Sequence, residues 1–515
     1  MSKEYLIGID IGSSNTKIMI CDKKCRIISN EMEENEIIIP KPGWVEYDPN
    51  EWWRKVKLLL RKSLSKSHIE SSEIAGIGIS SLGGTVVTVN ENGETVYNAI
   101  PWSDQRAEEE LELLERKKDI IFKITGNIPN ILNSTSKILW FKNKKPEIYK
   151  NIYKFFEPTG FLGLKLTGNF TMDWTFASGF DLGFDYKKLK FSDELVEKIG
   201  LDIDKFPDLH ANTRSIGGIN RDAALKTGLA EGTPVFIGGH DVVAAAVGAG
   251  AIYPGQGYFS VGSAANLLLM TDKDITSPYM LSILHIVNPK IRILDGVQSS
   301  VGFSLKWFRD NLGSIEKEIS EKIGNLSAFE IFDIQAEKAS PGSGGLIYLP
   351  FFFGKFHPDF MKNTSSCFIG ISPKTKREQI IRSIMEGTIY NMYENLESAF
   401  SLGIKVDEII TNGGPARSRI WCQIMADIAN KKIITLNSPE GSPFGNIILA
   451  GVGSGLFGSF DEAIENFVIR GTVFNPDEKN HKLYMRLFGI YKEISASLKD
   501  NFTKLKELKT SFNLV

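Results

Sequence analysis

LIGIDIGSSNTKIMI, residues 6–20, is the most informative segment for the fold of this 515-residue chain. Apolar and small residues lead up to Asp10, a Gly-Ser-Ser-Asn turn follows, and a second β-type run ends the stretch. This pattern predicts a β-hairpin with a short polar turn. GYFSVGSAANLLLM, residues 257–270, repeats the order of strand, turn and strand near the middle of the chain. One such pattern in each half predicts two domains built on the same plan.

Each predicted hairpin is followed by further β-type runs and by amphipathic helical patterns. The β-type runs are IAGIGISSL at 74–82 and EIITNGG at 408–414, and the helical patterns cover 51–65 and 376–402. This alternation predicts an α/β fold class. The turn-rich segment GAIYPGQG begins at Gly250 and separates a helical pattern from the second hairpin. We therefore expect an N-terminal domain over residues 1–252 and a C-terminal domain over residues 253–515.

The composition narrows the class of partner. Hydrophobic residues make up 42% of the chain and charged residues 24%, which is typical of a globular protein with ample core. Lys plus Arg number 60 against 62 Asp plus Glu, so no net charge favours nucleic acid or an anionic membrane as partner. The start, MSKEYLIGID, lacks the pattern of a signal peptide, and no apolar run reaches membrane-spanning length. These features predict a cytoplasmic protein that binds small molecules.

The four cysteines do not predict a metal site. Cys21 and Cys25 form a C-x3-C pair without a partner His or Cys at zinc-like spacing, and Cys367 and Cys422 stand alone. Reduced structural thiols are the expectation.

The first hairpin carries residue types that suit phosphate chemistry. Asp10 ends a strand, and the small residues after it favour a tight turn whose backbone N–H groups face an anion. A carboxylate can hold Mg²⁺ directly or through water, and Lys17 follows closely on the same hairpin. An ordinary polar hairpin turn explains the string equally well, since glycine-serine turns are common.

A second candidate lies in TNGGPARSRIW, residues 411–421. A β-type run ends at Gly413-Gly414 and gives way to a helical pattern. Glycines at such a turn let a ligand such as a nucleotide lie against bare backbone at a helix N-terminus. A plain βα turn accounts for the same string. The motif is neither a Rossmann nor a Walker loop.

A lone carboxylate stands in GGHDVVAAAVGAG, residues 238–250. VFIGGHD is typical of a buried strand that ends at a Gly-Gly turn, and the small apolar residues that follow predict a closely packed helix. Asp241 would then lie at or near a helix N-terminus, where an anion is favoured. A helix N-cap is the structural interpretation of that position.

Eight segments in this order resemble the FGGY family of carbohydrate kinases, over nearly the whole chain. They are IGIDIGSSNTK, GWVEYDPNEWW, PWSDQRA, TMDWTFASGFDLGFD, GGHDVVAAAVGAG, GLIYLPFFFG, NGGPARSRIW and GNIILAGVGSG. The resemblance implies two actin-like (RNase H-like) domains with ATP and sugar in the cleft between them. It implies transfer of the γ-phosphate of ATP to a hydroxyl of a small sugar, polyol or sugar acid, with the xylulokinase and gluconate kinase group as the most similar and a xylulokinase-like enzyme as the first expectation.

The same resemblance implies roles for individual residues. Asp241 matches the catalytic base, and Asp10 matches the acidic residue near Mg²⁺, so both are expected near the metal. The residues expected to bind ATP are Asp10, Gly12, Ser13, Ser14 and Lys17 of the first turn, Gly262 and Ser263 of the second, and Gly413, Gly414 and Arg417 on the adenosine side. ATP and Mg²⁺ are the implied cofactors, and dimers are common in the family, so a homodimer is among the expectations.

The sugar side departs from the family pattern. Where xylulokinases have Met-His and glycerol kinases Arg-Glu, this chain has the uncharged SSLGGT, and Val242 follows the base in place of Asn or Gln. GLIYLPFFFGKFHP lacks Gly-Glu-Arg-x-Pro, and the second phosphate turn has Ala264 where a Ser is common. The remaining candidates for sugar binding are Ser81, Leu82, Trp102, Asp104, Arg106, His240, Asp241 and Gln298. Core packing is the alternative for Trp102, and a neutral structural role is the alternative for His240.

Two other functions share parts of this pattern. An actin-like or chaperone-like ATPase uses the same phosphate hairpins, so the hairpins do not discriminate. A kinase-derived sensor that binds sugar without turnover would explain the uncharged pocket at Leu82 and Val242. Retention of Asp10 and Asp241 favours a working kinase over the sensor.

Overall fold

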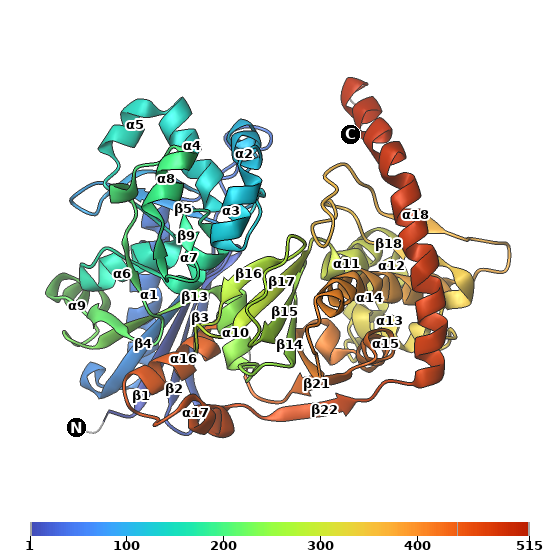
Figure 1. Ribbon diagram of the computed structural model, residues 1–515. Coiled ribbons are helices and arrows are strands. Elements are labelled where there is room, and N and C mark those ends of the chain that lie inside the picture. Colours follow the sequence, from blue (N-terminus) through green and yellow to red (C-terminus); the bar gives the residue numbers. More distant parts are fainter. Residues whose placement is uncertain (1–2, 440, 513–515) are drawn as a thin grey trace. The chain divides into compact units, whose positions relative to one another are not determined.

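The two predicted hairpins are the central strands of two sheets. In the computed structural model, which describes residues 3–439 and 441–512, β1 (Tyr5–Ile11) and β2 (Asn15–Asp22) form the first hairpin, and β14 (Gln256–Val261) and β15 (Ala265–Thr271) form the second (Figure 1). The chain divides into two compact units. Unit 1 comprises Met1–Ile252, Asp274–Ile293 and Ser438–Ile469, and unit 2 comprises Tyr253–Lys273, Leu294–Asn437 and Arg470–Val515. The expected boundary at residues 252 and 253 remains a prediction for the family domains, and two later segments return to unit 1.

The main sheet of unit 1 has the strand order β12-β13-β4-β1-β2-β3. Its strands beyond the hairpin are β3 (Ile27–Glu34), β4 (Ile74–Ser81), β12 (Ser215–Gly218) and β13 (Pro234–His240). β1 pairs with β2 in antiparallel and with β4 in parallel, and β13 pairs with β4 in parallel. The β-type run predicted at 74–82 is therefore confirmed as a central strand.

Unit 1 also has smaller strand pairs and the following helices. The strands are β5 (Val86–Val89), β6 (Thr95–Ile100), β7 (Lys154–Phe156), β8 (Thr171–Asp173), β9 (Phe184–Asp185), β10 (Lys190–Phe191), β11 (Asp208–His210) and β16 (Leu281–Leu284). The helices are α1 (Pro49–Ser67), α2 (Glu108–Glu115), α3 (Lys118–Thr125), α4 (Ser134–Lys144), α5 (Pro146–Asn151), α6 (Pro158–Thr167), α7 (Trp174–Phe180), α8 (Asp193–Ile199), α9 (Arg221–Thr227), α10 (Asp241–Gly248), α16 (Ser442–Gly453) and α17 (Phe460–Phe467).

The main sheet of unit 2 repeats the order. The full strand order is β16-β17-β15-β14-β20-β21-β22, and the part from β17 onward matches unit 1, with β17 (Arg292–Gln298), β20 (Glu408–Gly413), β21 (Lys432–Leu436) and β22 (Arg470–Phe474). Its other elements are β18 (Ile347–Leu349), β19 (Cys367–Ile369), α11 (Val301–Leu312), α12 (Ser314–Ile323), α13 (Ala328–Ala336), α14 (Arg377–Ser401), α15 (Arg419–Ala429) and α18 (Glu478–Ser511). β14 pairs with β15 in antiparallel and with β20 in parallel, as β1 pairs with β2 and β4. The prediction of two domains on one plan is confirmed.

Glycines in the strands of unit 1 let a helix lie directly on the sheet. A Cβ atom at Gly8 of β1 would come within 1.9 Å of the Pro443 carbonyl oxygen of α16, and one at Gly78 of β4 within 2.2 Å of the Asn446 carbonyl oxygen. The isoleucines that alternate with these glycines are fully buried. The period-2 pattern of β1 and β4 therefore has a packing cause, because only hydrogen at alternate positions leaves room for the backbone of α16.

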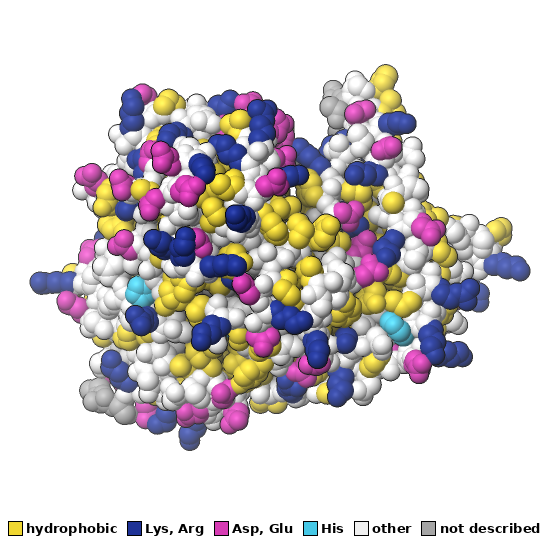
Figure 2. Space-filling view, viewed as in Figure 1, with side chains coloured by type: hydrophobic (Ala, Val, Ile, Leu, Met, Phe, Trp, Pro, Cys, Tyr) yellow, Lys and Arg dark blue, Asp and Glu magenta, His cyan; other side chains and the backbone are white. Residues whose placement is uncertain are grey.

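The predicted amphipathic helices and free thiols agree with the structure. The pattern at 51–65 lies inside α1, whose N-cap Asp48 accepts a hydrogen bond from the Asn50 N–H, and the pattern at 376–402 matches α14. All four cysteines are free. Within the described residues, none of the helices is both long and apolar enough to cross a membrane. Figure 2 shows basic and acidic side chains interspersed over the visible face, as expected from their near-equal numbers.

Candidate active site

Three parallel strands of unit 1 end at the same place. In the β1–β4 and β4–β13 registers, Asp10 lies beside Ser80 and Ser80 beside Gly239. The chain then passes from β13 directly into α10 at Asp241. Open α/β sheets bind ligands at the carboxyl ends of their parallel strands, so this edge is the expected place for a site.

Asp10 is buried and held by a chain of hydrogen bonds. The Ser80 hydroxyl donates to the Asp10 carboxylate at 2.7 Å, and the Asn446 side-chain amide donates to Ser80 Oγ and to the Ile9 carbonyl oxygen, both at 2.8 Å. Lys17 pairs with Asp10 across the hairpin. Burial and the negative charge of Asp241 raise the pKa of Asp10 to about 7, against the opposing effects of Lys17 and Ser80.

Asp241 is the first residue of α10 and keeps a quarter of its side chain exposed. The helix N-cap is His240, whose side chain makes no capping hydrogen bond. The N-cap interpretation of Asp241 is therefore wrong by one position, although its Oδ1 accepts from the Val242 N–H at 2.8 Å. Burial raises the pKa of Asp241 to about 6, and that N–H group and Lys17 limit the rise. The partly exposed carboxylate is thus open to a ligand.

The glycine pair before Asp241 has two separate causes. A Cβ atom at Gly238 would lie 2.1 Å from Oδ1 of Asn446, and Gly239 has a φ of +68°, in the left-handed region. The first position must be glycine because a Cβ atom there would clash with Asn446. The second position favours glycine because its φ is positive. The turn aims the chain so that α10 starts with its carboxylate at the strand edge.

His240 is a neutral neighbour of Asp241. Its Nε2 lies 3.2 Å from Oδ1 of Asp241, and its ring contacts Phe180 edge-on with the ring centres 4.9 Å apart. Burial lowers the pKa of His240 to about 3, so the ring is uncharged at neutral pH. A Cβ atom at Gly83 would come within 2.8 Å of this ring and 2.5 Å of Phe180, so the two aromatic rings fill the space above the uncharged SSLGGT loop.

Two residues of that loop are buried within unit 1. Ser81 is fully buried, and Leu82 packs in the main hydrophobic cluster with 2% of its surface exposed. Trp102 is half-buried and packs on the same cluster, so its core-packing alternative has support. A substrate-binding role for these residues remains a prediction.

Asp104 and Arg106 bind one another. Arg106 donates to both carboxylate oxygens of Asp104 at 2.8 Å and to Glu46 at 2.8 Å, and its guanidinium lies 3.8 Å from the centre of the Trp44 ring. Both charged side chains are fully buried. Their donors and acceptors brace the loop at residues 44–46, because Asp104 also accepts from the Val45 N–H at 2.6 Å. Sugar binding by either residue stays a prediction.

Three buried acids of unit 1 were given no role by the sequence analysis. Asp173 and Asp181 flank α7, and Glu157 accepts hydrogen bonds from Ser134 and the Thr85 N–H. Within the described part of the chain, both carboxylate oxygens of Asp181 and one of Asp173 lack a hydrogen-bond partner. Burial raises the pKa of Asp173 to about 6, and burial with the charge of Asp173 raises that of Asp181 to about 8. Both acids lie in TMDWTFASGFDLGFD. Their positions on either side of a short apolar run could have marked them as candidate site residues in the sequence.

The turn of the first hairpin keeps only part of its backbone open. The Gly12 N–H donates to the Asn15 carbonyl oxygen at 2.9 Å, so this group is used within the turn and is not free as expected. Asn35 donates to the Gly12 carbonyl oxygen at 2.8 Å and the Tyr47 hydroxyl to that of Ser13 at 3.0 Å. The N–H groups of Ser13 and Ser14 have no partner in the described structure. These two groups are the available anion donors.

The turn of the second hairpin has the same arrangement. The Gly262 N–H donates to the Ala264 carbonyl oxygen at 2.8 Å, and the Phe303 N–H of α11 donates to that of Ser263 at 3.1 Å. A Cβ atom at Gly302 would lie 2.2 Å from the Gly262 carbonyl oxygen, so the start of α11 packs directly on the turn. Gly262 and Ser263 are exposed.

A cavity of about 650 Å³ in unit 2 adjoins this turn. It is lined by Gly262 and Ser263, and also by Gly414 and Arg417 of the predicted adenosine-side turn. Gly413 has a φ of +83°, and its Cβ would lie 2.0 Å from the Val261 carbonyl oxygen, which ties β20 to β14 there. The sequence analysis missed further lining residues: Leu305, Lys306, Arg309, Phe329, Asp333, Ser418 and Trp421. A volume of this size is typical of small-molecule sites, and the lining combines apolar and aromatic side chains with polar and charged ones.

Gln298 lies at the end of β17 and is buried with 1% of its surface exposed. Neither its side-chain oxygen nor its nitrogen has a hydrogen-bond partner in the described structure. A ligand-binding role for Gln298 stays a prediction.

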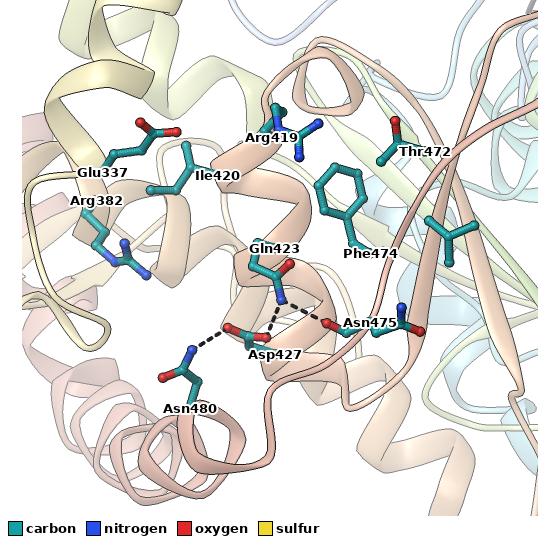
Figure 3. Close-up of a pocket in the computed structure, with 11 residues that line it drawn as sticks. Glu337, Arg382, Arg419, Ile420, Gln423, Asp427, Thr472, Phe474, Asn475 and Asn480 are labelled. Carbon is teal, nitrogen blue, oxygen red and sulfur yellow. Dashed lines mark hydrogen bonds between the residues drawn. The ribbon is translucent and has the colours of Figure 1, made fainter.

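A second cavity of unit 2, of about 570 Å³, has polar groups that bind one another (Figure 3). Asn480 and Gln423 both donate to Asp427, at 2.9 and 2.7 Å, and Gln423 also donates to the Asn475 carbonyl oxygen at 2.9 Å. Arg382 of the same lining donates to Glu386 and Tyr484. These bonds fasten α15 to the segment that leads into α18, which is a structural role.

Comparison with known proteins fits this arrangement. Residues 5–248 match the FGGY family of carbohydrate kinases, N-terminal domain, and residues 257–454 match its C-terminal domain. Xylulose kinase of Bacillus subtilis is 28% identical over 511 residues, covering 98% of this chain and 99% of that protein. Gluconokinase of Bacillus licheniformis is 26% identical over 512 residues, covering 99% of both. The crystal structure of ligand-bound xylulose kinase from Lactobacillus acidophilus matches with a TM-score of 0.89 at 24% identity, covering 97% of this chain and 99% of that one.

The neighbours confirm the fold class, an α/β protein of two actin-like domains. Family membership also favours the kinase over the ATPase or sensor alternatives. The chain belongs to the FGGY family of carbohydrate kinases and is an ATP-dependent phosphotransferase that acts on a carbohydrate hydroxyl.

Proposed function

We propose that this enzyme phosphorylates an uncharged ketose or polyol, with a xylulose-like sugar as first candidate, and that Asp241 is its catalytic base. The observation that carries the proposal is the position of Asp241 at the start of α10, partly exposed and at the strand edge where Asp10 also lies. A sugar hydroxyl is too weakly acidic to attack phosphorus unaided. The carboxylate accepts the hydroxyl proton as the oxygen attacks the γ-phosphate, which contributes about a hundredfold to ten-thousandfold to the rate.

His240 positions the base in this proposal. Its uncharged ring can donate one N–H to Oδ1 of Asp241 and leaves the carboxylate negative. The other oxygen of Asp241 then remains for the sugar hydroxyl.

Asp10 fits a magnesium site. Mg²⁺ is commonly held by one or two carboxylates together with substrate phosphates and water, and its charge stabilises the charge that develops on the transferred phosphoryl group. No group of three or more His, Cys, Asp or Glu side chains that could hold a metal ion occurs among the described residues. Asn446 and Ser80 fix the orientation of Asp10, and Lys17 opposes its proton uptake.

Backbone donors in both units are suited to the phosphates of ATP. The N–H groups of Ser13 and Ser14 would bind one phosphate, and the turn at Gly262-Ser263 another. The cavity of unit 2 that includes Gly262, Gly414 and Arg417 would take the nucleoside. Phosphoryl transfer depends mainly on positioning and charge stabilisation, so these cradles, one metal and one base suffice.

The charges near the base favour an uncharged acceptor over an aldonate. Lys17 lies opposite Asp10, Arg106 is bound to Asp104 and Glu46, and Lys137 donates to two backbone carbonyl oxygens. Asp173 lies near Gly239, and both carboxylate oxygens of Asp181 and one of Asp173 have no hydrogen-bond partner among the described residues. A sugar carboxylate beside Asp173 would meet negative charge, and desolvating it would cost free energy.

The experiment that tests this proposal is ADP release with ATP and Mg²⁺ across xylulose, other ketoses, pentitols, glycerol and gluconate. Each is run with wild type and with Asp241→Asn. One strong neutral responder that is lost in the variant supports the proposal. Gluconate as the best substrate would contradict the acceptor class, and background hydrolysis unaffected by every sugar would favour the ATPase alternative. The cytoplasmic location and homodimer expected from the sequence stay predictions.

A further inference from the structure

The nucleoside cavity of unit 2 is lined by two carboxylates of α13, Glu330, which accepts from the Ser327 N–H in the helix capping box, and Asp333, which the phosphate-binding role does not use. Asp333 of α13 lines the cavity together with the turn residues Gly262 and Ser263. A carboxylate repels phosphate, so it cannot serve that part of a nucleotide. It must face the ribose or the base.

Asp333 is held in a fixed place. The Ser418 hydroxyl donates to Oδ1 of Asp333 at 2.8 Å. Ser418 is also the N-cap of α15, and its Oγ accepts a hydrogen bond from the backbone N–H of Trp421 at 3.1 Å. Because a serine hydroxyl has one hydrogen, its donor capacity is used by Asp333. The other carboxylate oxygen makes no hydrogen bond with the described residues, and Asp333 is half-buried.

Aromatic side chains accompany this carboxylate. Phe329 stands one helical turn before Asp333 on α13, and i,i+4 residues share a helix face. Trp421 also lines the cavity, and its indole N–H is buried without a partner in the described structure. The Arg309 guanidinium lies 5.0 Å from the centre of the Phe329 ring. Flat aromatic surfaces suit a planar base better than a sugar ring.

The two polar groups match one edge of adenine. Adenine has an amino donor at C6 beside an acceptor ring nitrogen, whereas a 6-oxo purine has two acceptors there. Asp333 supplies an acceptor and Trp421 a donor. A carbonyl oxygen placed against the Asp333 carboxylate would lose a hydrogen bond and meet like partial charge.

We propose that Asp333, oriented by Ser418, accepts a hydrogen bond from the exocyclic amino group of the nucleotide base, and that it selects adenine over 6-oxo purines. This inference rests on the proposed nucleotide site in unit 2. It assigns a specificity residue within that site.

The test is calorimetric binding of ADP and IDP, because IDP differs in having a carbonyl in place of the amino group. Binding needs no sugar and no turnover, so it is independent of Asp241 and of the acceptor. We expect wild type to bind ADP about tenfold to a hundredfold more tightly than IDP, as a hydrogen bond to a charged group implies. Asp333→Asn should bring the ratio close to one, because an amide can accept from the amino group or donate to the carbonyl.

The controls separate the causes. Glu337→Gln removes a carboxylate just after α13 that is not among the lining residues of this cavity, and it should keep the wild-type ratio. Asp333→Ala should also lose the preference, which guards against a folding effect specific to one variant. An unchanged ratio in both Asp333 variants overturns the inference. A loss of affinity for 2′-deoxy-ADP with equal binding of ADP and IDP would place the carboxylate at the ribose and overturn it as well. Absence of binding by either nucleotide would instead refute the nucleotide site itself.

Discussion

The hairpin of unit 1 and the hairpin of unit 2 share their place in the sheet and differ in the side chains they carry. In unit 1, Asp10 pairs with Lys17 across the hairpin and lies beside Ser80 of β4. In unit 2, Ser260 of β14 pairs with Asn266 and lies beside Asn412 of β20. In both turns the first N–H group, that of Gly12 or Gly262, donates to a backbone carbonyl oxygen of the same turn. The N–H groups of the turn residues that follow have no partner in the described structure. The shared fold therefore repeats the turn, whereas a charged pair stands at this strand position only in unit 1.

The buried acids of the two units differ in the same sense. In unit 2, Glu386 accepts from Arg382 at 2.8 Å and Glu394 from Lys355 at 2.7 Å. In unit 1, Asp173 and Asp181 make no ion pair with any described residue. Buried charges paired with cations brace a structure, whereas unpaired acids with raised pKa values cluster at functional sites. Unit 1 also has a cation-paired set, Asp104 and Glu46 with Arg106, so the unpaired acids mark a local group around α7 and not unit 1 as a whole.

The largest expected effect is that of Asp241→Asn. The change keeps the shape and removes the proton acceptor, so we expect kcat to fall by about a hundredfold to ten-thousandfold while ADP binding by calorimetry stays near wild type. Asn437 follows β21 as Asp241 follows β13 and is the matched control in unit 2. Asn437→Ala should leave kcat unchanged. Equal kcat values for wild type and Asp241→Asn would remove the base assignment.

The next effect compares the two hairpins directly. Asp10→Asn should lower kcat/KM by roughly tenfold to a hundredfold, because groups that hold a metal or its ligands typically contribute that much. Raising the Mg²⁺ concentration should recover part of the loss. Ser260→Ala changes the equivalent strand position of unit 2 and should leave kcat/KM within about twofold, as expected for a residue without a charge role. Similar losses in both variants would mean that the two hairpins contribute alike.

The sequence predicted the strands and helices that this comparison uses, but it did not predict the contacts between residues far apart in the chain. Both hairpins, β4, α1 and α14 were expected because alternation and helical periodicity depend on neighbouring residues. The bond between Asn446 and Ser80 joins residues 366 positions apart, and no local pattern records it. The pairing of Asp333 with Ser418 was missed for the same reason.

The sugar side shows a different limit. Asp104 and Arg106 have residue types that suit hydroxyl binding, and composition alone cannot tell that they bind each other. Likewise, the sequence contains two glycines in the SSLGGT loop, but it does not reveal that the rings of Phe180 and His240 leave no room for a Cβ atom at Gly83. On the sugar side, the residue types suggested hydroxyl binding, but the residues that these side chains contact could not be predicted.

A smaller effect concerns the turn that closes the nucleoside cavity. Gly413→Ala should lower the Tm by a few degrees, because its Cβ would meet the Val261 carbonyl oxygen at 2.0 Å and its φ of +83° strains any other residue by about 1–3 kcal/mol. Gly414 has a φ of −54° and no atom within 4 Å of an added Cβ. Gly414→Ala is the matched control for stability and should keep the wild-type Tm in thermal unfolding. A Tm for Gly413→Ala equal to that of the control would show that β14 and β20 can separate at this turn without cost.

The smallest effect tests whether the unpaired acids of unit 1 lower stability. The pKa of Asp181 is raised from its ordinary value to about 8, mainly by burial and then by Asp173. Between those two pH values the folded protein keeps a proton that the unfolded chain has lost, so the free energy of unfolding falls as pH rises through this window. Asp181→Asn stays uncharged, so its stability relative to wild type should grow from pH 4 to pH 9 and reach on the order of 1 kcal/mol, measured by urea unfolding at each pH. Asp119→Asn, which removes an exposed carboxyl of the same unit, should show no such trend. A difference between Asp181→Asn and wild type that does not change with pH would mean that Asp181 is already neutralised by a partner at every pH, and the contrast with the ion-paired acids of unit 2 would then be lost.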